Sequence, residues 1–152
     1  MISTASKHSQ RLELHDAYLA NLTSNILGDF DPKYETDLFS LHIQTRSYID
    51  TSEVFELCDD EDYGIFKVKV NFGVRWSRNS EVEEPEMDIC AIIEGLFVAE
   101  YLVKEQVEQS ILDEFAFIHV ITDVWPYWRE LLTSQCSRMH LTGVKLPHRP
   151  KG

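Results

Sequence analysis

The sequence predicts an α+β fold in which strands come first and helices follow. Strand-like patterns occur between residues 12 and 99, whereas the apolar spacing beyond residue 102 is helical. A chain of 152 residues has the length of one domain. Because the two kinds of element are segregated, we expect an antiparallel sheet with helices over one face.

The first predicted strand starts at Leu12. Apolar residues occupy most even positions from Leu12 to Leu22, and the odd positions are mostly polar. This alternation is typical of a strand with one solvated face. Residues 28–37 then predict an irregular connection, because they include Gly28 and Pro32.

Three further strands are predicted downstream. Residues 39–43 alternate between apolar and polar side chains, and residues 66–76 do so most regularly. Residues 89–99 are apolar on both faces, as expected for a covered strand. The acidic stretch 50–62 is interpreted as a loop, and residues 77–85 as a turn.

Two helices are predicted after the strands. A short helix is indicated by apolar residues at a spacing of four: Val103, Val107, Ile111 and Phe115. A longer helix is expected to begin at Pro126, because proline suits the first helical position, with Asp123 upstream as a capping or dipole partner. The longer helix has a mostly apolar stripe: Trp128, Leu131, Leu132, Gln135, Cys136 and Met139. Gly143 follows this helix, and the chain continues into a basic tail.

The predicted helices can cover only one face of the sheet. The other face and the two edge strands would remain open to solvent. Oligomerisation would solve both problems, so we expect assembly.

The charge of the chain limits its partners. Fourteen Lys and Arg face 26 Asp and Glu, which gives a formal net charge of −12. Nucleic acid and anionic membranes are therefore not expected as partners, because both need a positive protein surface. A basic or unfolded polypeptide fits the charge, although solubility alone also explains it.

Cysteine usage and hydropathy predict a cytoplasmic protein. Three widely spaced cysteines, Cys58, Cys90 and Cys136, show no metal-ligand spacing and cannot all pair. No stretch has the apolar length of a signal peptide or a membrane span.

We expect neither an enzyme nor a metal or other cofactor. No nucleotide-binding or nucleophile motif occurs, and none of the six histidines pairs with another at metal-ligand spacing. Cys136 lies on the apolar stripe of the last helix, where a buried thiol is expected. The run Asp59-Asp-Glu-Asp62 lacks the pattern of a calcium loop, and we interpret it, like the glutamates at 81–86, as a solvated charged segment.

Two aromatic residues have two possible roles, packing within the protein or binding another chain. Phe30 and Tyr34 lie in a loop that is otherwise polar. Loop aromatics can pack under their own chain, or they can line a hydrophobic groove for another chain.

A motif at residues 125–138 resembles the start of the long helix in the SecB family of protein-export chaperones. The matching residues, in order and without a gap, are Pro126, Tyr127, Arg129, Glu130, Thr133, Ser134, Ser137 and Arg138, with Trp125 at the family's aromatic position. Glu94-Gly-Leu-Phe97, Tyr18 and Leu146-Pro147 also match family features. The resemblance covers residues 11–147 and implies a four-stranded antiparallel sheet with a Greek-key crossover and one long C-terminal helix.

The resemblance also implies a function, a set of sites and domain limits. It implies an ATP-independent chaperone that holds non-native polypeptide and forms a homotetramer, a dimer of dimers. We expect the polypeptide-binding residues to be Phe30, Tyr34, Phe39, Phe97 and Tyr127. The oligomer interface is expected to use Trp125, Trp128, Leu131, Leu132 and Cys136. Residues 1–10 are expected to be disordered, 11–147 to form the domain, and 148–152 to form a basic tail.

Two departures from the family narrow the range of expected functions. The sequence does not continue into the family's second C-terminal helix, and Asn21 and Asn25 stand where the family has acidic contacts for the SecA motor. Both departures favour a SecB-like chaperone of a toxin–antitoxin system, which would hold an antitoxin, and they make SecA doubtful as a partner. The alternatives are a protein-export chaperone that delivers preproteins to SecA, and a noncatalytic oligomeric scaffold.

Overall fold

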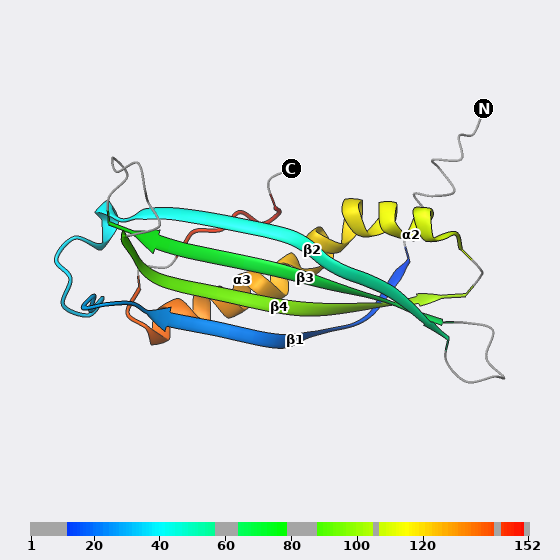
Figure 1. The fold of residues 1–152 in the computed structure, drawn as a ribbon, viewed down its shortest axis with the longest axis horizontal. Coiled ribbons are helices and arrows are strands. Elements are labelled where there is room, and N and C mark those ends of the chain that lie inside the picture. Colours follow the sequence, from blue (N-terminus) through cyan, green and yellow to red (C-terminus); the bar gives the residue numbers. More distant parts are fainter. Residues whose placement is uncertain (1–11, 57–63, 79–87, 105–106, 142–143, 151–152) are drawn as a thin grey trace, which may run out of the picture.

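One antiparallel sheet of four long strands forms the body of the protein (Figure 1). The structure, a computed structural model, describes residues 12–56, 64–78, 88–104, 107–141 and 144–150. The strands are β1 (Glu13–Ile26), β2 (His42–Glu56), β3 (Gly64–Ser77) and β4 (Ile89–Val103). The predicted disordered N-terminus, the acidic run at 59–62 and Gly143 lie outside the described residues.

The order of the strands confirms the predicted Greek-key crossover. The order in the sheet is β1-β4-β3-β2, and all three pairings are antiparallel. The segment between Ile26 and His42 therefore carries the chain from one edge of the sheet to the other. It contains the short 3-10 helix η1 (Leu38–Ser40).

The predicted loop at residues 50–62 is wrong for residues 50–56, which belong to β2. A shift in the pairing of β2 with β3 between Ile49 and Thr51 reverses the alternation there, so the strand pattern is hidden in the sequence. The predicted start of this strand at residue 39 is also wrong. Phe39 lies in η1, and β2 begins only at His42.

The core lies between the sheet and the long helix. The alternate residues of β3 from Phe66 to Trp76 all point to this side and are buried. Trp128 stacks on Phe72, with ring centroids 5.4 Å apart. Gly95 of β4 makes room for this packing, because a Cβ atom there would lie only 3.2 Å from Trp128 Cζ3. The Gly-x-Phe element of the sequence therefore lets the indole pack directly on the sheet.

Three helical segments follow one another without an interruption. They are α2 (Gln109–Phe115), the π-helical η3 (Ala116–Val120) and α3 (Ile121–Arg138), and α3 runs behind the sheet in Figure 1. The predicted helix start at Pro126 is therefore wrong, because Pro126 lies inside α3. Proline cannot donate to the carbonyl of Thr122, but both residues are exposed, so water can bind that carbonyl. Two residues assigned to the short helix also lie elsewhere: Val103 ends β4, and Val107 precedes α2.

The chain reverses after α3 and returns along it. His140 adopts a positive φ of 53°, and the main-chain N–H of Leu141 donates to the Cys136 carbonyl at 3.0 Å. This geometry ends helices by turning the chain back. Residues 144–150, red in Figure 1, then run from the end of α3 back toward the middle of the molecule. We call residues 144–150 the return segment.

Candidate functional site

Large apolar side chains are exposed along the helix side of β2. Ile43 and Val54 pair with the core residues Trp76 and Phe66, so they belong to the face of the sheet that the helices cover. Both nevertheless remain exposed, because β2 is an edge strand. Phe39, just before this strand, is 86% exposed.

Exposed apolar side chains also occur in the π-helical segment, which lies next to β2. Phe117 is 81% exposed and Ile118 is also exposed, whereas Ala116 and Val120 of the same turn are buried. Segment η3 contacts β2, and Ser52 Oγ of β2 donates to Asp113 Oδ1 of α2 at 3.2 Å. We call Phe39, Ile43, Val54, Phe117 and Ile118 the apolar rim. Four of these five residues carry no distinguishing signal in the sequence, since they stand among ordinary strand and helix positions.

The two loop aromatics have different surroundings. Tyr34 is 72% exposed, and the Lys33 ammonium lies 5.3 Å from its ring centroid. Phe30 is only 4% exposed, and the Arg78 guanidinium lies 5.4 Å from its ring centroid. Tyr34 is therefore available to a partner, whereas Phe30 packs under its own chain.

The other residues predicted to bind polypeptide also divide by burial. Phe39 and Tyr127 are exposed. Phe97 is buried, with its ring edge-on to Phe72 at 5.9 Å between centroids. Phe30 and Phe97 are thus core residues, whose rings a client cannot reach.

The residues predicted for the oligomer interface pack against the chain's own sheet. Trp125, Trp128, Leu132 and Cys136 are buried in the single chain, and Leu131 is partly buried. The apolar stripe of the helix is therefore the face that closes this core. An interface through α3 would have to use the opposite, exposed side of the helix, which carries Tyr127, Glu130 and Thr133.

A pair of substitutions in the crossover tests which of the two loop aromatics packs into the core. We expect Phe30→Ser to lower the free energy of unfolding by about 3–5 kcal/mol, because it removes a buried aromatic ring. The matched change Tyr34→Ser should stay within about 0.5 kcal/mol of the unchanged protein, because that ring is exposed. Urea denaturation followed by circular dichroism measures both. Equal stability of the two variants would contradict the burial of Phe30.

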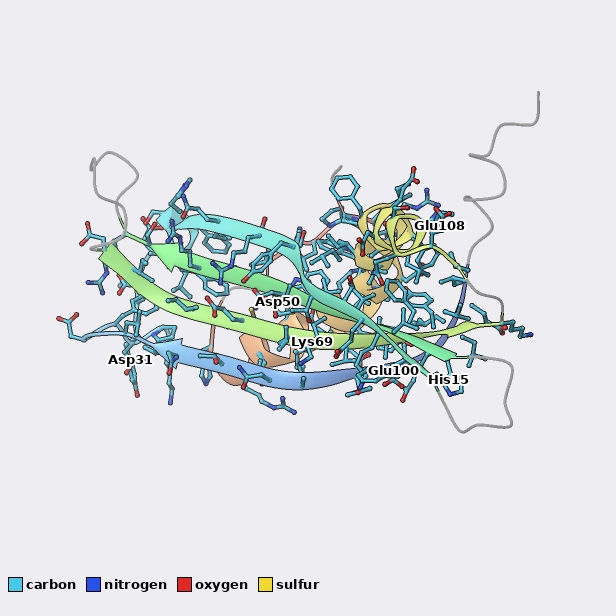
Figure 2. All side chains as sticks on the ribbon, turned by 45° about the vertical axis from the view of Figure 1, so that its right-hand side comes forward. His15, Asp31, Asp50, Lys69, Glu100 and Glu108 are labelled. Atoms are coloured by element: carbon cyan, nitrogen blue, oxygen red, sulfur yellow. The ribbon has the colours of Figure 1, made fainter. Side chains whose placement is uncertain are left out.

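The face of the sheet away from the helices combines ion-paired side chains with apolar ones such as Leu96 and Ile92. Arg46 and Glu94 form a salt bridge of 2.8 Å, and Lys67 lies 3.5 Å from Glu100. Figure 2 shows Lys69 and Glu100 on neighbouring strands of this face. A shallow hollow of about 490 Å³ lies near Arg46. Asn21 and Asn25 of β1 pair with Leu96 and Ile92, whose side chains belong to this face.

The described part of the chain holds no metal-binding cluster, and its two described thiols are not activated. No group of three or more His, Cys, Asp and Glu residues that could hold a metal ion occurs among the described residues. Burial raises the pKa of the Cys136 thiol, and burial is also the main cause that raises the pKa of Cys90. Both thiols are therefore protonated at neutral pH and poor nucleophiles. None of the described helices has the length and hydropathy to cross a membrane.

Comparison with known proteins identifies the fold. No family model matches the chain, and no curated protein matches it by sequence. Among solved structures, the chain is similar to Rv1957, a SecB-like chaperone of Mycobacterium tuberculosis solved in complex with a ChAD peptide from the Rv1956 HigA1 antitoxin. The TM-score is 0.64 at 13% sequence identity, over 97% of this chain and 96% of that chain. The chain therefore has the SecB-like fold, as the motif at residues 125–138 predicts.

Proposed function

We propose that this protein is an ATP-independent chaperone that holds non-native polypeptide on the apolar rim. The proposal depends on the exposure of Phe39 and Phe117. Neither ring contributes to the core of the domain, and large exposed apolar side chains often mark a binding surface. Exposed aromatic side chains serve as anchors for another chain. The SecB-like fold supports the same function.

We propose an antitoxin as the client of the chaperone. The support is the fold's similarity to a chaperone that was solved with an antitoxin peptide. The net charge of −12 favours clients with basic segments. Delivery of preproteins to SecA is the alternative within the same class.

We further propose a cytoplasmic homotetramer, with β1 as one of the sheet edges that assembly would cover.

Suppression of aggregation tests the proposed function against a scaffold role. We expect the protein to reduce light scattering from an unrelated unfolded protein without ATP, and more so for a basic client than for an acidic one. A scaffold would leave scattering unchanged even at a large molar excess. Light scattering of the protein alone gives its mass, and a monomer at all concentrations would rule out the tetramer.

Calorimetry with purified SecA tests the alternative partner. Asn21 and Asn25 are exposed but uncharged, so we expect weak or undetectable binding of SecA. A control variant with Asn21→Asp and Asn25→Glu should gain affinity if this face can dock SecA at all. Micromolar or tighter binding by the unchanged protein would favour the export function.

A further inference from the structure

The return segment is held to α3 at three points. The Trp125 indole Nε1–H donates to the Pro147 carbonyl at 2.8 Å. Arg129 Nη1 lies 2.8 Å from His148 Nδ1, which must accept, because a guanidinium only donates. The main-chain N–H of Val144 lies close to the Cys136 thiol and lowers the pKa of this thiol against the larger effect of burial.

Two of these three contacts use only the main chain of the return segment. The Pro147 carbonyl and the Val144 N–H are groups that polypeptides of almost any sequence can offer. The side-chain contacts are equally general. Val144 and Leu146 are partly buried against the core, whereas Lys145 between them is exposed. The surface of α3 that includes Trp125, Arg129 and Cys136 therefore recognises an extended segment with apolar residues two positions apart.

We propose that this surface of α3 is a binding site for extended client polypeptide, and that the return segment is its exchangeable internal occupant. The site continues toward the rim, because Phe117 and Ile118 lie about two helical turns before Trp125 in the same run of helix. The return segment carries Lys145 and Arg149, so it resembles the basic, apolar client that the net charge of the protein favours. This inference rests on the proposed function, since it extends the client site from the rim onto α3.

Competition by the return segment sets the size of the expected effect. If the segment is displaced in about one molecule in ten, the apparent Kd for a client is raised about tenfold over that of the free site. Weakening the segment should therefore tighten client binding, whereas weakening a client contact would loosen it. The direction of the change in client Kd therefore shows whether the return segment competes with the client or forms part of the surface that binds it.

Removal of residues 144–152 gives the first test. The probe is fluorescein-labelled pancreatic trypsin inhibitor that has been reduced and carboxyamidomethylated, a basic unfolded chain, and anisotropy measures its binding. We expect the shortened protein to bind about three- to tenfold tighter than the full chain. A synthetic peptide of residues 144–152 should reverse this gain by competing for the exposed site.

A point substitution keeps the test valid if the shortened protein does not fold. Leu146→Ser removes the apolar contact without changing the charge, and we expect it to tighten client binding at least about threefold. The matched control Lys145→Arg keeps the charge of an exposed neighbour and should leave the Kd nearly unchanged. Equal affinity of the full chain, the shortened protein and the Leu146→Ser variant would overturn the inference while leaving the chaperone function in place. Absence of client binding by all of them would overturn the proposed function itself.

Discussion

Replacing Trp128 by alanine should lower the free energy of unfolding by about 3–5 kcal/mol. The Trp128 side chain is only 1% exposed, stacks on Phe72 and lies against Gly95. Its removal would leave a cavity between α3 and the sheet that neighbouring rings cannot fill without moving. Chemical denaturation followed by circular dichroism, at several protein concentrations, measures the effect.

The neighbouring residue offers a matched control for this change. Tyr127 is exposed on the outer side of α3, so Tyr127→Ala should change the stability by less than about 0.5 kcal/mol. The result also decides between two roles for Trp128. A Trp128→Ala protein that keeps its stability but forms smaller species in light scattering would restore the predicted interface role and contradict the packing described above.

The double change Phe117→Ser and Ile118→Ser should weaken client binding strongly while leaving the fold intact. Anchoring aromatic residues can each contribute about 2 kcal/mol or more, which corresponds to about thirtyfold in Kd. Because both side chains are exposed, we expect a change in the free energy of unfolding of less than about 0.5 kcal/mol. Anisotropy of a labelled unfolded client, measured beside denaturation curves, separates the two quantities.

A substitution on the opposite face of the sheet controls for a general loss of apolar surface. Tyr48 is about as exposed as Val54, but it pairs with Asn71 and so belongs to the face away from the helices. Tyr48→Ser should therefore leave the client Kd within about twofold. If Tyr48→Ser weakens binding as much as the double change does, the client site does not lie on the apolar rim.

The sequence was most informative where a short motif and a regular period agreed. The alternation from Phe66 to Trp76 predicted β3 almost to its ends, because a half-covered strand must repeat every two residues. The motif at residues 125–138 predicted a SecB-like fold, and the structure confirms it. Where the period is broken by irregular pairing, as near Asp50 in β2, the pattern predicted a loop instead.

Residue type alone could not separate core aromatics from surface aromatics. Phe30 and Tyr34 stand four residues apart in one polar loop, yet one is buried and the other exposed. The difference arises from contacts with distant parts of the chain, such as Arg78 over the Phe30 ring. The same holds for Phe117 and Ile118, whose exposure depends on the π-helical turn and on how η3 meets β2.

By itself, the sequence determined the α+β class, the antiparallel strands and the long helix, because each leaves a local period or a short motif. Only the tertiary structure decided which face of that helix is buried in the core, which aromatic rings are exposed, and where residues 144–150 lie. These properties depend on side chains that are far apart in the chain and meet only after folding, so no local pattern records them.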